Sequence, residues 1–221
     1  MYMEENVMQN TKILDMLNNG QIEELKALIR EEIFADELKS KPGAKQRYAA
    51  MKKYFSYIDN HGNKIMEMPC EVEVGGEKYV SFTNGCSIAL TKEDAGEIKL
   101  FENSKDYLNI GKYFSYDGNI SEIDFNKLLA KAKSKGYKLN KSEVDQNGDF
   151  KYVLYFDGSY YKIGLLDATF GIINDGEKST VWHKSDEKHS PIIIKSSIGV
   201  CLVLPFKYDE EKEGVTILEV E

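Results

Sequence analysis

CEVEVGGEKYVSFTNGCSIALT, residues 70 to 91, alternates apolar and polar side chains and contains two pairs of turn-forming residues, GG and NG. It is rich in β-branched residues, which favour strands. Gly-Gly and Asn-Gly between such runs are typical of tight hairpins. The stretch therefore predicts three short antiparallel strands, and with them a sheet in this part of the chain.

The residues before this stretch, 1 to 58, are predicted to be helical. In KILDMLNNGQIEELKALIREEIFADEL apolar side chains recur at helical spacing, and Gly20 is placed to end a first helix. Pro42 and Gly43 then break the pattern. A further helix is predicted by four apolar residues at intervals of three and four: Tyr48, Met51, Phe55 and Ile58.

Downstream, one more helix and several strands are predicted. Residues 123 to 134 have one apolar side and end before Gly136, which predicts a helix. FKYVLYF, KSTVWH, SPIIIKSS and GVCLVLPFK read as strands, whereas residues 93 to 119 fit either an extended connection or an edge strand. The expected fold class is α+β: a helical N-terminal segment, 1–58, followed by antiparallel sheets backed by helices, 59–221, with room for two compact subdomains divided near residue 120.

Composition predicts a folded protein. The chain has 221 residues, of which 42% are hydrophobic and 11% aromatic, enough to fill a core. The sequence contains no apolar run of membrane-spanning length and no signal-peptide pattern at its start, so a cytosolic protein without membrane contact is expected. Cys70, Cys86 and Cys201 are widely spaced, as are the three histidines, which favours reduced thiols and neither a metal site nor a cofactor.

Positive charge is concentrated in two segments of an acidic chain. The net charge is −8, yet KSKPGAKQRYAAMKK (39 to 53) and NKLLAKAKSKGYKLNK (126 to 141) each contain six Lys or Arg and no acidic residue. Surfaces tuned for solubility mix their signs, so this segregation suggests a phosphate-binding track. The alternative is a solvated lysine-rich helix face. The residues expected to face DNA are Lys45, Arg47, Lys52, Lys53, Lys127, Lys131, Lys135 and Lys138.

The second half of the chain resembles bacterial sliding clamps, the beta subunit of the replicative DNA polymerase. Three groups of residues in the tail match the family's closing helix and last two strands: Leu165 to Ala168, Pro191 to Ile194 and Leu204 to Lys207. Thr83, Gly85 and Ile88 match the clamps' Thr-Asp-Gly hairpin. The resemblance covers roughly residues 60 to 207, and it suggests a divergent, shortened clamp from a phage or another mobile element.

The resemblance implies a site as well as a fold. In the family these two elements lie on neighbouring domains and line an apolar pocket for short peptide motifs of polymerases and loaders. The implied partner-binding residues are Thr83, Gly85, Cys86, Ile88, Leu202, Leu204, Pro205, Phe206 and Lys207. The terminal KYDEEKEGVTILEVE (207 to 221) could either cover this pocket or pair at a sheet edge.

Three functions are weighed. The first is a non-enzymatic protein that tracks or encircles double-stranded DNA without reading its sequence and tethers replication or repair factors, by family analogy as a ring of three copies. The second is a clamp-like interaction module, a decoy or regulator of host replication proteins, that does not bind DNA. The third is an enzyme such as a nuclease; a thiol pair of Cys86 with His183 or His189 can be drawn, but no convergent cluster is visible in the sequence.

Overall fold

A computed structural model describes most of the chain. It covers residues 14, 16–18, 20–59, 69–83, 85–96, 98, 100, 114, 119–138, 151–183, 190–208 and 214–220, with the side chains of 53 and 55–59 excepted. The chain divides into two compact units, Met1–Ala44 and Lys45–Glu221. The division precedes the third predicted helix rather than following it.

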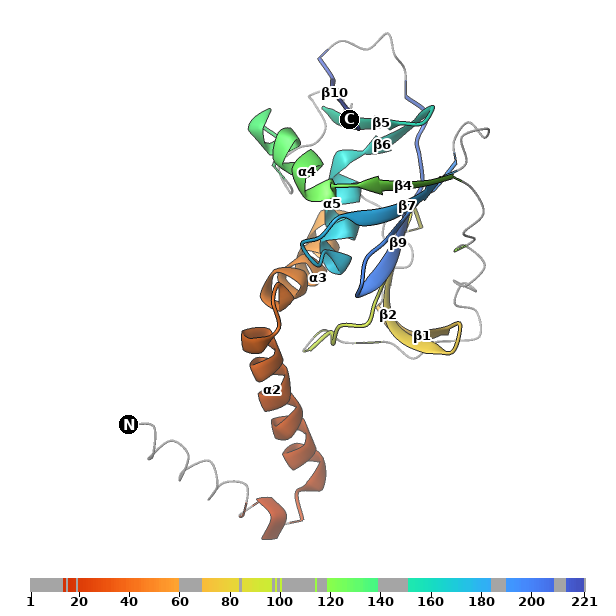
Figure 1. Ribbon diagram of the computed structural model, residues 1–221. Coiled ribbons are helices and arrows are strands. Elements are labelled where there is room, and N and C mark those ends of the chain that lie inside the picture. The colour runs from red at the N-terminus through yellow and green to blue at the C-terminus, as the bar shows by residue number, and fades with distance from the viewer. Residues whose placement is uncertain are drawn as a thin grey trace. The chain divides into compact units, whose positions relative to one another are not determined.

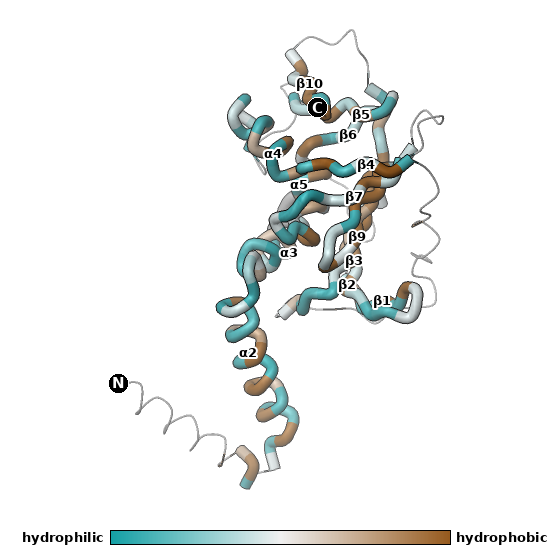
Figure 2. Tube along the Cα trace, in the orientation of Figure 1, coloured by the Kyte–Doolittle hydropathy of each residue, from teal (hydrophilic) through white to brown (hydrophobic). Residues whose placement is uncertain are grey.

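The first unit contains helix α2, Ile22–Ser40. Gly20 has φ +71°, and its N–H donates to the carbonyl of Leu17, so it ends the preceding helical turn as expected. Glu23 and Glu24 lie in the first turn of α2, where carboxylates favour the helix dipole. Teal and brown segments alternate along this helix, because polar and apolar residues share it (Figure 2).

The second unit is built on a seven-stranded antiparallel sheet, with strand order β1-β2-β3-β9-β8-β7-β4 (Figure 1). The strands are β1 (Cys70–Val74), β2 (Glu77–Thr83), β3 (Ser87–Thr91), β4 (Asn119–Ile123), β7 (Ser179–His183), β8 (Ile192–Lys195) and β9 (Gly199–Val203). The three strands predicted in residues 70 to 91 are confirmed as β1, β2 and β3. Because strands from both sides of residue 120 belong to this one sheet, the subdivision allowed there is not present.

A three-stranded sheet, in the order β10-β5-β6, completes the strands. It contains β5 (Tyr152–Phe156), β6 (Ser159–Lys162) and β10 (Thr216–Glu219). β10 pairs in parallel with β5, so the terminal segment adds a strand to a sheet edge, one of its two predicted roles.

Three helices belong to the second unit: α3 (Ala44–Asp59), α4 (Phe125–Ser134) and α5 (Ile163–Ile173). Nearly every side chain of α5 is buried, because this helix packs on β3 and β9 and also contacts β5 and β6. Phe125 of α4 meets Phe170 of α5 with ring centroids 5.2 Å apart. The main apolar core therefore surrounds α5.

A buried polar chain joins two of these helices to the sheet. The hydroxyl of Thr169 on α5 lies 3.0 Å from that of Ser87 on β3, and the Tyr54 hydroxyl of α3 lies 3.2 Å from the same Ser87 oxygen. All three side chains are buried. Since hydroxyls without partners are costly to bury, these bonds fix how α3 and α5 sit on β3.

The middle of the large sheet is apolar on both faces. β3 and β9 are buried along their whole length, and both are brown around the sheet centre in Figure 2. One face joins the core around α5. The other carries a second cluster formed by Cys70, Val72, Ile88, Leu90, Phe114, Ile193, Val200 and Leu202.

Most predicted elements are confirmed, and the α+β class with them, but two local predictions need correction. Ile123 ends β4 instead of beginning a helix, because Asp124 caps α4: its carboxylate accepts from the N–H of Lys127 at 2.9 Å. β6 was not predicted, since its four residues SYYK directly precede α5. The ambiguous 93 to 119 segment leads into β4, which is an edge strand of the large sheet.

Gly199 allows the close pairing of β9 with β3. A Cβ there would overlap the carbonyl oxygen of Leu90 and lie 2.8 Å from Cγ2 of Ile173. We expect Gly199→Ala to lower the free energy of unfolding by about 3 kcal/mol, since backbone cannot yield as a side chain does. Gly171→Ala on α5 is the matched control: its Cβ meets only Cβ of Ala50, at 3.1 Å. Urea denaturation should show the control within about 1 kcal/mol of wild type. Equal losses would contradict this assignment.

Candidate functional site

The two elements of the implied partner site are brought together. β3 and β9 are neighbouring strands, with Ile88 opposite Leu202, and the N–H of Leu204 donates to the carbonyl of Cys86 at 2.9 Å. The resemblance implied that they lie on neighbouring domains. Here they lie in one sheet of one unit, so any surface they form belongs to a single rigid element.

Three of the implied partner-binding residues are not accessible. Ile88 and Leu202 belong to the second apolar cluster, at 7% and 3% exposure. Thr83 is buried as well, and its hydroxyl donates to the carbonyl of Ser87 at 2.9 Å. These side chains stabilise the sheet, and the prediction that they contact a partner is corrected.

The remaining implied residues reach the surface. Gly85 is exposed with φ +79°, and Cys86 is half-buried. Leu204 is 40% exposed, while Pro205 and Phe206 are half-buried and Lys207 is exposed. The N–H of Phe206 donates to the carbonyl of Tyr160 on β6 at 2.9 Å. The chain therefore leaves the large sheet after Val203 and pairs with the small sheet three residues later.

Aromatic rings extend this surface over the small sheet. The ring of Tyr160 lies 4.9 Å from that of Tyr155 and 4.7 Å from that of Tyr208. Tyr208 in turn lies 6.1 Å from Phe206. We call Tyr155, Tyr160, Leu204, Pro205, Phe206 and Tyr208 the docking surface. Its tyrosines were not predicted as site residues, because strand aromatics are more often core residues. Their position beside the last strand was the missing signal.

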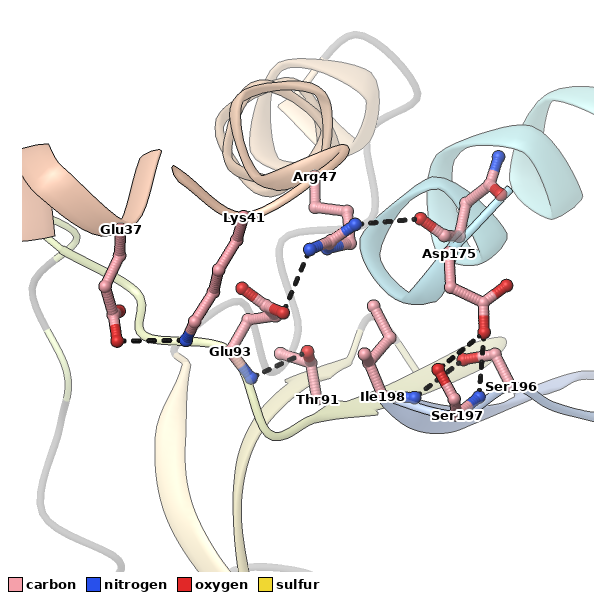
Figure 3. Close-up of polar contacts among 10 residues, drawn as sticks. Glu37, Lys41, Arg47, Thr91, Glu93, Asp175, Ser196, Ser197 and Ile198 are labelled. Carbon is pink, nitrogen blue, oxygen red and sulfur yellow. Dashed lines mark hydrogen bonds and ion pairs between the residues drawn. The ribbon is translucent and has the colours of Figure 1, made fainter. Parts of the chain in front are cut away.

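Arg47, predicted to face phosphate, is instead buried. Its side chain is 5% exposed, its Nη2 lies 3.0 Å from Oε1 of Glu93, and its Nη1 donates to the carbonyl of Asn174 at 3.4 Å (Figure 3). The guanidinium thus ties α3 to the loop after β3 and to the end of α5. Arg47 is corrected to a structural residue.

Next to it, Asp175 joins the end of α5 to the β8–β9 turn (Figure 3). The N–H and hydroxyl of Ser197 both donate to Oδ2 of Asp175, at 2.9 and 2.8 Å. Burial acts most strongly on this carboxyl and raises its pKa, but the hydrogen bonds together outweigh burial and lower it.

The two predicted lysine sets do not share one track. A hollow of about 400 Å³ lies between α3, α4 and α5, lined by Gln46, Arg47 and Ala50 of α3 and by Lys133 of α4, with four α5-side residues: Asp167, Ala168, Gly171 and Asn174. Lys45 and Lys52 are exposed and are not among these residues. Lys52 lies over the ring of Tyr48, 4.3 Å from its centroid. The side chain of Lys53 lies outside the described residues.

The predicted α4 lysines border a different hollow, of about 600 Å³. Lys127 and Lys131 line it together with Lys178, and so do three carboxylates, Glu122, Asp124 and Glu219. Lys135 and Lys138 are exposed beyond the helix. The lysine stripe on α4 is real, but its surroundings mix both signs of charge, and it faces away from the α3 lysines.

The thiol pair drawn from the sequence is not formed with His183. The ring nitrogens of His183 contact Asp157 and Ser121. Cys201 is fully buried, and burial raises its pKa, which keeps it protonated and unreactive. His189 lies outside the described residues.

Among the described residues, no helix is long and apolar enough to cross a membrane, and no group of three or more His, Cys, Asp or Glu could hold a metal ion. Protein-family models, curated proteins and solved structures yield no match to this chain. The sliding-clamp resemblance therefore stays a prediction from the residues that suggested it.

The Arg47–Glu93 pair should behave as a buried ion pair. We expect Arg47→Met to lower the free energy of unfolding by about 3 kcal/mol, because Glu93 is left buried without its cation. Adding Glu93→Gln should restore part of that loss in urea denaturation. The exposed pair of Lys92 with Glu77 is the control, and Lys92→Met should have a much smaller effect. Strictly additive losses at Arg47 and Glu93 would contradict the pairing.

Proposed function

We propose that this chain is a protein-docking module that holds a short apolar segment of a partner on the docking surface. The observation that supports this most is the position of Leu204 to Phe206. This segment is bonded to Cys86 at one end and to Tyr160 at the other, yet Leu204 remains 40% exposed. Apolar side chains held on a fixed backbone bind with little loss of conformational entropy.

The chemistry of the docking surface suits a peptide with a few apolar anchors. Aromatic side chains dominate binding energy at protein interfaces, and the surface presents four of them around one leucine and one proline. Lys162 lies with its Nζ 5.6 Å from the ring centroid of Phe206, which places a cation at the edge of the surface. A partner segment with two or three apolar side chains and an acidic neighbour would match this arrangement. The proposal corresponds to the second of the functions weighed from the sequence.

A peptide selection tests this proposal. Heptapeptides displayed on phage and selected on the purified chain should share apolar anchors. We expect Leu204→Glu to weaken the selected synthetic peptides at least about tenfold in fluorescence anisotropy, since one lost anchor costs more than about 1 kcal/mol. Ile217→Glu is the matched control, because Ile217 on β10 is also 40% exposed. A selection that yields no binders, or binders equally weakened by both variants, would overturn the proposal.

The second candidate is the DNA tether, and the exposure of Lys127, Lys135 and Lys138 favours it. If it is right, a labelled duplex binds at low salt, with an affinity that falls as salt rises by a slope of about −0.9 per phosphate contacted. Replacing Lys127, Lys131 and Lys135 by Gln should reduce that slope, whereas Lys45→Gln with Lys52→Gln should not, because those lysines lie on a different flank. Absence of duplex binding at low salt would eliminate this candidate.

A further inference from the structure

Three polar side chains from different strands form a hydrogen-bonded series beside the docking surface. His183 ends β7, Ser121 lies on the neighbouring strand β4, and Asp157 lies in the turn between β5 and β6. Nδ1 of His183 is 2.5 Å from Oδ2 of Asp157, and its Nε2 is 3.3 Å from Oγ of Ser121. The series therefore joins the small sheet to the large one through a single imidazole.

The local fold holds each member in place. Phe156 pairs with Ser159, so Asp157 and Gly158 form a two-residue hairpin loop, with φ +46° and +76°. Such turns require positive φ at both positions and commonly use Asp-Gly, which fixes where the carboxylate points. The imidazole packs edge-on against Phe156, with centroids 4.6 Å apart, and its side chain is 9% exposed.

The hydrogen bonds determine what the imidazole can do. An ionised carboxylate only accepts, so the Nδ1 bond to Asp157 places the proton of a neutral ring on Nδ1. Nε2 then carries the lone pair and can accept the hydroxyl proton of Ser121. A carboxylate that orients a histidine, which in turn contacts a serine hydroxyl, is the arrangement that activates serine nucleophiles on unrelated folds.

We propose that Ser121 is a nucleophilic serine that accepts acyl groups from small esters, with His183 as its general base and Asp157 as a positioning residue. Ser121 is half-buried on an edge strand of the large sheet, where a small reagent can reach it. This activity goes beyond the docking function, and none of the three residues belongs to the docking surface.

The reaction proceeds in two balanced steps. Oγ of Ser121 bonds to the carbonyl carbon of the ester while its proton passes to Nε2 of His183, and the ester C–O bond breaks as the alcohol leaves with that proton. Water, deprotonated by the same Nε2, then attacks the acyl-serine. The acid is released, and Oγ recovers its proton from the imidazolium.

An alkyl fluorophosphonate that carries a fluorophore tests the nucleophile directly. Attack by Oγ forms an O–P bond and releases fluoride, so the folded wild-type chain should gain one adduct by intact mass, and peptide mapping should place it on Ser121. Ser121→Ala should abolish the adduct. The control is Ser196→Ala, another half-buried serine whose hydroxyl bonds to the carbonyl of Gly199, and it should keep the adduct.

The roles of the other two residues are separated by inactivation kinetics. His183→Gln should slow labelling by about 10²-fold, the contribution of a general base. Asp157→Asn should lower the maximal inactivation rate but leave the half-saturating reagent concentration unchanged, because Asp157 does not touch the reagent. Circular dichroism verifies that each variant is folded. No adduct on the folded wild type, or an adduct that persists in Ser121→Ala, would overturn the proposal.

Discussion

The pairing of β3 with β9 is the interaction on which the rest of the structure depends. It joins the hairpins of residues 70 to 91 to the last strands of the chain, and Gly199 permits the close contact with β3 that this requires. α5 packs on these two strands, and hydrogen bonds through Ser87 hold α3 and α5 to them. The same pairing places Leu204 beside Cys86, so the docking surface follows from it.

Local features of this fold could be predicted from the sequence because they depend on short-range periodicity. Alternation and Gly turns in residues 70 to 91 were sufficient for β1 to β3, and one apolar side was sufficient for α4. Ile123 shows the limit, because its apolar side chain fits either the end of a strand or the start of a helix. Only the cap formed by Asp124 separates the two. β6 is too short for alternation to distinguish it from the start of α5.

The candidate site was less predictable, because it depends on contacts between distant residues. Charge clustering suggested that Arg47 faces phosphate, but nothing in the sequence reveals that Glu93 lies opposite it. The apolar character of Thr83 to Ile88 and Leu202 to Phe206 was recognised, but which side chains are buried depends on sheet neighbours. Ser121, Asp157 and His183 come from three separate strands, so no motif could connect them. Both functional proposals therefore rest on geometry that a linear pattern does not contain.

The register of β3 on β9 is the most direct test of this account. Cross-strand nuclear Overhauser effects in the isotopically labelled chain should connect Ile88 with Leu202 and Leu90 with Val200. A shift of one residue would instead join Ile88 to Cys201 and turn every side chain of β3 to the opposite face. Contacts in that shifted register, or contacts of β3 with a strand other than β2 and β9, would contradict the account.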